Sequence, residues 1–422
     1  MDPSDPDGRR AQIARQLSHW TAAAERLRAL DDLAAPAAWA GLERYLGTTL
    51  RATLTSSVGR LVAHGTALHT ALHTARTHDE FAALRRQVLA YRGRYLRTET
   101  TVAFYADAVN SRTNPRLAAL LRACDSLAYR SMALVLDPLR KSTPVVLTYV
   151  DDGIGAAVLK ARLRLWDPDT ESPAATIKIV RHALLCPTSL IHEAGHQVAH
   201  LTGWNAELAA ALARSTRAAP PEVGDVWAGW ASEITADAFA FVHTGYAAVA
   251  NLHDVLSGGE QLVFRLLPGD PHPVGYLRVL LNTAMCRHVY GDGPWDALER
   301  TWRHDHPLDA CRDAESRTLI EASLPLLPAL AEAILTAPLT AFGNRPLIAL
   351  VPPERVAPPA LVALEAQLGP ALYTSTHWLW TESLRLLALS GWKAATQPER
   401  AGELGAEQYA WMSRLGGAEQ AA

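Results

Sequence analysis

Residues 190–196 read Leu-Ile-His-Glu-Ala-Gly-His, and this segment lies near the middle of a chain of 422 residues. An α-helix turns about 100° per residue, so His192 and His196 lie on nearly the same face, one turn apart. Two imidazoles in this arrangement can share one metal ion, and neutral imidazole nitrogen is a good ligand for Zn²⁺. Glu193 lies on the neighbouring face, where its carboxylate can reach a water without becoming a ligand. The spacing therefore predicts a helix that carries two zinc ligands and a general base.

A second pair of residues further along the chain supplies the ligand that is still needed. Glu233 and Asp237 are four residues apart and therefore share a helix face. Their neighbours, which include Trp230, Ile234 and Phe241, are apolar. Carboxylates in such a setting are costly to bury unless they are paired or metal-bound, and a catalytic zinc requires three protein ligands. We expect Glu233 to be the third ligand and Asp237 to accept a hydrogen bond from a ligand histidine.

The pattern His192-Glu193-xx-His196 followed by Glu233-xxx-Asp237 resembles the gluzincin zinc metallopeptidases, in which a glutamate on a second helix completes the zinc site. Residues 233–238, Glu-Ile-Thr-Ala-Asp-Ala, are most similar to the M48-type branch, although this chain has no convincing counterpart of the membrane helices usual there. The resemblance covers about residues 175 to 280. It implies one zinc ion, a zincin-like core and a peptidase that uses Glu193 as general base.

Residues 270–278, Asp-Pro-His-Pro-Val-Gly-Tyr-Leu-Arg, resemble the His-Pro…Arg segment that follows the glutamate helix in M48-type enzymes. Attack on a carbonyl develops negative charge on its oxygen, and a positioned donor stabilises that charge. We expect His272 or Tyr276 to be this donor. Arg278 is expected to pair with Asp237 or to orient Glu233.

The remaining sequence predicts an α+β fold that is predominantly α-helical, with a small sheet beside the active-site helix and further helices wrapped round it. Apolar spacing of three and four residues predicts helices over 9–142, after a disordered lead at 1–8. Strand-like segments at 145–150, 156–166 and 173–180 place the zincin-like core at 143–310. Helices are again expected over 311–422, with a Pro-rich connector near 337–359.

The strand at 176–180 has a possible role of its own. In zincins an edge strand beside the active helix binds an extended peptide by adding it to the sheet. An ordinary structural strand is an equally good interpretation of these residues.

Composition limits the partners that we expect. The net charge of −3 gives no global reason to expect nucleic acid or an acidic membrane. The four cysteines form no CxxC pair, which argues against a disulfide framework or a cysteine-ligated zinc. The best membrane-span candidate, 324–342, contains Glu332 and three prolines. We expect a cytoplasmic protein that acts on a peptide or protein, with the N-terminal helices available to a protein partner.

Three other functions stay open. A zincin scaffold can serve as a non-catalytic or regulatory binding protein, although such a protein would be free to lose Glu193. A zinc hydrolase can also act on an amide that is not a peptide. Glu193-xx-His196 is half of a helical di-iron site, but that site usually needs a second Glu-xx-His, and the sequence contains none.

Overall fold

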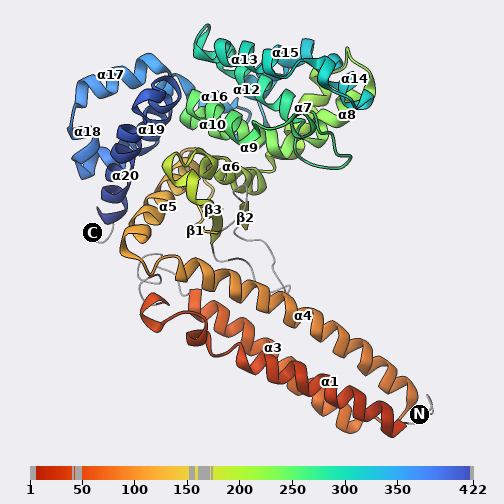
Figure 1. The fold of residues 1–422 in the computed structure, drawn as a ribbon. Helices are drawn as coiled ribbons and strands as arrows, with labels where there is room; N and C mark the ends of the chain where they lie inside the picture. Colours follow the sequence, from red (N-terminus) through yellow and green to blue (C-terminus); the bar gives the residue numbers. More distant parts are fainter. Residues whose placement is uncertain are drawn as a thin grey trace. The chain divides into compact units, whose positions relative to one another are not determined.

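The computed structural model describes residues 6–39, 42, 50–151, 157–159, 172 and 174–418. The chain divides into two compact units (Figure 1). The N-terminal unit comprises residues 1–117 and 161–174, and the sheet-containing unit comprises 118–160 and 175–422. Helices predominate in the described residues and are accompanied by one three-stranded sheet. This confirms the predicted α+β class with a mostly helical chain.

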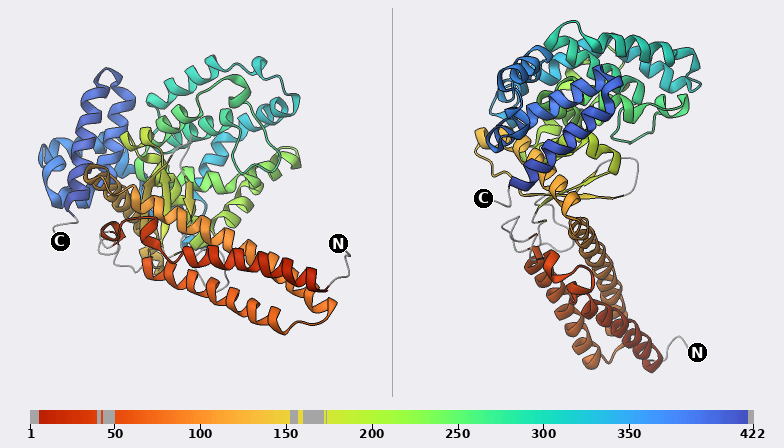
Figure 2. Two further views of the ribbon diagram at one scale, coloured as in Figure 1. Left: turned by 60° about the horizontal axis from the view of Figure 1, so that its bottom comes forward. Right: turned by 60° about the vertical axis from the view of Figure 1, so that its left-hand side comes forward.

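The N-terminal unit is built from α1 (Pro6–Arg26), α3 (Leu50–Thr74) and α4 (His78–Asn110), which pack side by side (Figure 2). A short 3₁₀ turn, η1 (Leu30–Asp32), follows α1. The buried positions of α4 recur every three or four residues, as the apolar spacing predicts. Residues 6–8 belong to α1, so this part of the predicted disordered lead is helical, and residues 1–5 lie outside the described residues.

The sheet contains β1 (Val146–Val150), β2 (Ala157–Leu159) and β3 (Ala175–Ile179) in the order β1-β3-β2. Thr148 of β1 and Val158 of β2 both pair with Ile177, in parallel and antiparallel ladders respectively. All three predicted strand segments therefore contain a strand, although 160–171 lies outside the described residues. The predicted role of 176–180 as an edge strand is wrong, because β3 is paired on both sides and the two edge strands are β1 and β2.

The helix α6 (Thr188–Thr202) lies between the sheet and α9 (Ala231–Thr244), because it contacts β2 and β3 as well as α9. It ends at Gly203, whose φ of 79° is a left-handed conformation that favours glycine. Further helices of the described residues surround this pair. They are α7 (Trp204–Ser215), α8 (Pro221–Gly229), α10 (Tyr246–Leu256), α11 (Glu260–Val263), α12 (Gly275–Tyr290), α13 (Pro294–Asp305), α14 (Ala314–Ser323), α15 (Leu327–Thr336), α16 (Leu347–Leu350), α17 (Pro358–Leu368), α18 (Ala371–Thr374), α19 (Thr376–Thr396) and α20 (Ala401–Ala418). Short 3₁₀ turns connect several of them, namely η2 (Asp137–Leu139), η3 (Arg181–Leu185), η4 (Leu308–Ala310), η5 (Leu324–Leu326), η6 (Thr340–Phe342), η7 (Pro353–Val356) and η8 (Pro398–Arg400).

The division of the chain differs from the predicted one at both ends of the core. From residue 118 onward, α5 (Pro115–Leu136) belongs to the sheet-containing unit, where Asp125 accepts hydrogen bonds from the backbone N–H and the hydroxyl of Thr148. The C-terminal helices belong to the same unit, and α19 packs on α9 and α10. The Pro-rich segment 337–359 is no free connector, because Phe342 is fully buried against Trp204.

One helical stretch of the described residues, Ala314–Thr336, is long and apolar enough to cross a membrane by length and composition alone. It consists of α14, η5 and α15, and 44% of its most apolar window is buried inside the structure. Its buried side chains include Leu330 and Ile334, and α15 packs against α12.

Candidate metal centre

The candidate site is formed where α6 crosses α9. A Cβ atom at Gly195 would lie 2.9 Å from the Cα of Ala236 and 2.9 Å from the Cβ of Phe239. A side chain at this position of α6 would therefore force the two helices apart. Glycine permits the close approach that brings the histidines of α6 to Glu233 of α9.

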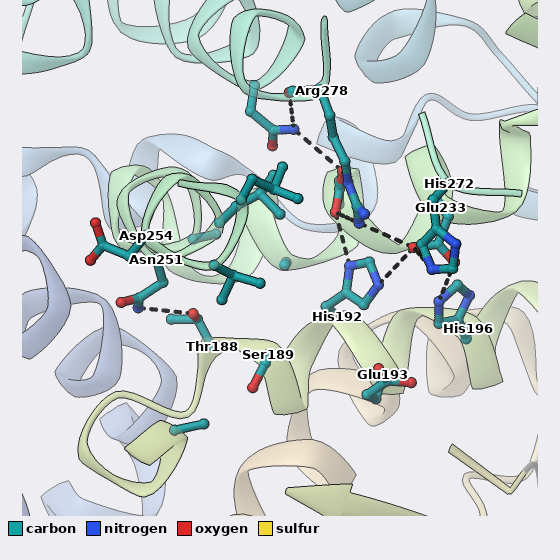
Figure 3. Close-up of a pocket in the computed structure, with 18 of the residues that line it drawn as sticks. Thr188, Ser189, His192, Glu193, His196, Glu233, Asn251, Asp254, His272 and Arg278 are labelled. Atoms are coloured by element: carbon teal, nitrogen blue, oxygen red, sulfur yellow. Dashed lines mark hydrogen bonds and ion pairs between the residues drawn. The ribbon is translucent and has the colours of Figure 1, made fainter. Parts of the chain in front are cut away.

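Three predicted ligands converge at this crossing (Figure 3). One nitrogen each of His192 and His196 and one oxygen of Glu233 all lie within 4.8 Å of one another. The Nε2 atom of His192 is 3.4 Å from Oε2 of Glu233, and Nε2 of His196 is 3.2 Å from Oε1. Ligand atoms of a tetrahedral zinc with bonds of about 2.0–2.2 Å lie roughly 3.3–3.5 Å apart. The two nitrogen–oxygen distances run to different oxygens of Glu233, and the three-residue set as a whole spans up to 4.8 Å. The nitrogen–nitrogen–oxygen donor set therefore suits a zinc ion, and the ligands would draw together to bind it.

A buried arginine and the carboxylate of Asp237 hold these ligands in place. Nδ1 of His192 lies 2.9 Å from Oδ1 of Asp237, so Nε2 is directed toward Glu233. Arg278 of α12 donates through Nε to Oδ2 of Asp237 at 2.7 Å and through Nη2 to Oε2 of Glu233 at 3.1 Å. Asn282, one turn along α12, also donates to Asp237 at 3.4 Å. Arg278 thus makes both of the contacts that were predicted as alternatives.

The charges of this cluster reinforce one another. Burial works against an ionised Asp237, but the charge and hydrogen bonds of Arg278, together with those of His192, outweigh it and lower the pKa of Asp237 to about 2. Burial likewise opposes ionisation of Glu233, yet hydrogen bonds from His192 and His196 hold its pKa well below the ordinary value. Burial would lower the pKa of His192, whereas the hydrogen bonds to Asp237 and Glu233 raise it to about 9. Both carboxylates are therefore ionised and suited to a cation.

Glu193 occupies the face of α6 next to the two histidines, and its side chain lines the same cavity. It is 93% buried, since its exposed fraction is 7%. Burial raises the pKa of its carboxyl, although the neighbouring His192 and His196 act in the opposite direction. A carboxylate with a raised pKa is a stronger proton acceptor than an exposed one.

His272 lies on the loop before α12 and faces the cluster from the opposite side to α6 (Figure 3). Its Nε2 is 3.6 Å from Oε2 of Glu233. Its Nδ1 is 2.6 Å from Oδ1 of Asp270, which also accepts a hydrogen bond from the backbone N–H of His272 at 3.0 Å. Asp270 therefore orients the imidazole. Sequence reasoning gave Asp270 no role, although its position two residues before a histidine was a usable signal.

Tyr276 does not lie at the site. Its side chain is 2% exposed and packs on Phe264, with ring centroids 5.2 Å apart, and it is not among the residues that line the cavity. Tyr276 and Arg278 are two positions apart on α12, so their side chains point about 200° apart round the helix. Since Arg278 faces Asp237, Tyr276 must face the opposite side. The prediction of Tyr276 as an oxyanion donor is therefore wrong.

The site opens into a cavity of about 1050 Å³ in the sheet-containing unit. From the ligands it extends along α6 to Thr188 and Ser189 and along α10 to Asn251 and Asp254 (Figure 3). Ala157 and Val158 of β2 line another part of it. No motif indicated these residues, because they come from three separate elements. The volume lies at the upper end of the roughly 300–1,000 Å³ of small-molecule pockets.

We expect Gly195→Ala to weaken both folding and metal binding. The added methyl group meets backbone and Cβ atoms of α9 at 2.9 Å, so α6 and α9 must separate. Overpacking of this kind costs about 1–3 kcal/mol. Thermal unfolding and zinc titration of the variant measure the two effects. Gly203 ends the same helix but lies away from the crossing, so the control variant Gly203→Ala should leave zinc affinity unchanged. Equal zinc affinity of wild type and Gly195→Ala would contradict the close-approach argument.

Comparison of the chain with protein-family models, with curated proteins and with solved structures found no match. The resemblance to the gluzincins stays a prediction from the motifs at 192–196, 233–237 and 270–278.

Proposed function

We propose that this protein is a zinc-dependent metallopeptidase that hydrolyses peptide or amide bonds. The observation that carries the proposal is the convergence of His192, His196 and Glu233 in a cavity that Glu193 also lines. A three-ligand set beside an unused carboxylate is the arrangement of a catalytic zinc site, whereas structural zinc sites usually have four protein ligands. A zincin-like core is part of the same proposal, supported by the sheet that packs on α6.

A bound zinc would polarise the scissile carbonyl and lower the pKa of a water molecule toward neutrality. The chain itself contributes the proton transfers. Glu193 accepts the proton of the attacking water and passes it to the nitrogen of the leaving amine. Burial of Glu193 favours this role, because it raises the pKa of the carboxyl toward that of an effective base.

His272 is the proposed donor to the developing oxyanion. Its Nδ1–H is held by Asp270, so Nε2 is the nitrogen that faces the cluster, 3.6 Å from Glu233. Donation from Nε2 to the oxyanion requires the doubly protonated ring, in which both nitrogens carry a proton. The side chain is 58% exposed at the cavity mouth, where it can adjust to a substrate. Arg278 and Asp237 act through the ligands, since they orient Glu233 and His192 without facing a substrate directly.

The edge of the sheet offers a way to bind an extended peptide. β2 is one of the two edge strands, and its residues Ala157 and Val158 line the cavity that contains the metal ligands. A peptide added beside β2 would use backbone hydrogen bonds for affinity and would reach the site with one face of its side chains. This moves the proposed peptide-binding strand from 176–180 to 157–159.

The direct test is cleavage of a complex peptide mixture. The zinc-loaded protein is incubated with a proteome digest, and new peptide ends are identified by mass spectrometry. We expect new ends that disappear when a chelator is added and return when zinc is restored. If no zinc-dependent ends appear, a general peptidase is refuted. If the protein hydrolyses only simple amides in a zinc-dependent way, the non-peptide hydrolase is favoured.

We expect His272→Ala to lower kcat by about 10²–10³-fold, the usual effect of removing one oxyanion donor. Zinc content should not change, because His272 is not one of the three ligands. Asp270→Asn should have a smaller effect, since it weakens only the orientation of the ring. His304→Ala, on the polar end of α13, serves as a control. A His272→Ala enzyme with wild-type kcat would exclude the oxyanion role.

A further inference from the structure

The net charge of −3 conceals an uneven distribution along the chain. Residues 8–24 of α1, 50–74 of α3 and 81–98 of α4 contain no aspartate or glutamate. The same segments contain ten arginines, which are Arg9, Arg10, Arg15, Arg51, Arg60, Arg85, Arg86, Arg92, Arg94 and Arg97. These three helices pack on one another, so the arginines belong to one body. These helices therefore carry an excess of arginine that the overall charge does not reveal, although Arg51 pairs with Asp31, and Glu25, Asp79, Glu80 and Glu99 flank the acid-free segments.

The middle of α4 combines this charge with exposed apolar side chains. Leu89 is 49% exposed and Leu96 is 38% exposed. At about 100° per residue, Leu89 and Leu96 lie on the same stripe of the helix as Arg85 and Arg92. All four are exposed, whereas the opposite face of α4 is buried in the N-terminal unit.

The other side of the leucine stripe is also cationic. Arg86 and Arg97 are exposed and lie about 60–100° round the helix from the leucines. We call Arg85, Arg86, Leu89, Arg92, Leu96 and Arg97 the cationic face of α4. Along the helix axis it spans about 18 Å. The guanidinium of Arg92 lies 5.5 Å from the ring centroid of Trp20, a half-buried residue of α1 that borders this face.

We propose that the cationic face of α4 docks on an anionic lipid surface. The planar guanidinium of arginine binds phosphate well, and each cationic side chain near an anionic bilayer adds to the electrostatic attraction between protein and lipid. Leucines that lie among cations match the boundary between headgroups and acyl chains, where amphipathic helices insert their apolar side chains. A nucleic-acid backbone would satisfy the arginines but would leave both leucines in water. The lipid surface accounts for both kinds of side chain, and it goes beyond the proposed peptidase function.

The test is flotation of the full chain with vesicles of phosphatidylcholine alone or mixed with phosphatidylglycerol. We expect binding to the mixed vesicles at least about tenfold stronger than to the neutral ones. Binding should weaken between about 0.1 M and 1 M salt, because the Debye length falls from about 10 Å to about 3 Å. Equal binding to both vesicle types, or none to either, would overturn the proposal.

Two double variants separate the contributions of charge and apolar contact. Arg85→Glu with Arg92→Glu should weaken binding to the mixed vesicles by about thirtyfold or more. Leu89→Ser with Leu96→Ser should weaken it at least about threefold, and circular dichroism verifies that each variant is folded. Arg214→Glu with Arg217→Glu, exposed positions of the sheet-containing unit, is the matched control and should bind like wild type.

The leucine variant also decides between lipid and nucleic acid. If duplex DNA binds in place of the vesicles and only the arginine variant weakens it, the surface is one for nucleic acid and the lipid proposal fails. A control variant that loses vesicle binding as strongly as the α4 variants would also overturn it, because the attraction would then reflect charge anywhere on the chain.

Discussion

Glu193→Gln is expected to lower kcat for peptide cleavage by about 10³- to 10⁴-fold while the protein keeps its zinc. Glutamine has the shape of glutamate but cannot accept the proton of the attacking water. The loss should be confined to turnover, because Glu193 lies on the neighbouring face of α6 and is not one of the three convergent ligands.

Steady-state kinetics and metal analysis of the same samples measure this prediction. Glu222→Gln, an exposed carboxylate at the start of α8, is the matched control and should behave like wild type. Retained activity in a zinc-bound Glu193→Gln protein would refute the general-base role. Loss of zinc from that variant would instead identify Glu193 as a ligand.

Glu233→Ala is expected to abolish zinc binding at micromolar metal. It removes one of three ligands and leaves the guanidinium of Arg278, 3.1 Å from the lost carboxylate oxygen, facing the site. A positive charge beside an incomplete metal site disfavours the binding of a cation. We therefore expect zinc affinity to fall by more than about 100-fold, which is the upper end of the effect of an outer-shell partner.

Asp237→Asn supplies the comparison for that loss. It keeps all three ligands and removes only the carboxylate that orients His192 and pairs with Arg278. Zinc affinity should fall by about 10- to 100-fold. Isothermal titration with zinc measures both variants, and an unchanged zinc affinity of Glu233→Ala would refute Glu233 as a ligand.

The part of the site that lies within single helices was predictable. His192 and His196 share a face, as do Glu233 and Asp237, because helical periodicity is a local property of the backbone. The same periodicity shows that Tyr276 and Arg278 could not both face the site, since they lie about 200° apart round α12. The sequence alone could not show whether Tyr276 or Arg278 points toward the site, because that depends on where α12 packs.

Features that join distant segments were not predictable. β3 lies between β1 and β2 although it follows both of them along the chain, and this order depends on how the strands pair. The double contact of Arg278 with Glu233 and Asp237 likewise depends on the placement of α12 against α9. The cavity has no sequence signature, since its walls come from β2, α6, α9, α10 and the loop before α12.

By itself, the sequence determined which residues form the candidate metal site, because helical periodicity and side-chain chemistry both depend on the local sequence. It also contained the acid-free cationic segments of the first helices, although their meaning required knowing that they pack together. Only the tertiary structure decided the edge strands, the burial of Tyr276 and the approach of His272 to Glu233. These depend on contacts between segments, and such contacts follow from how the whole core packs around Gly195 and the crossing of α6 with α9.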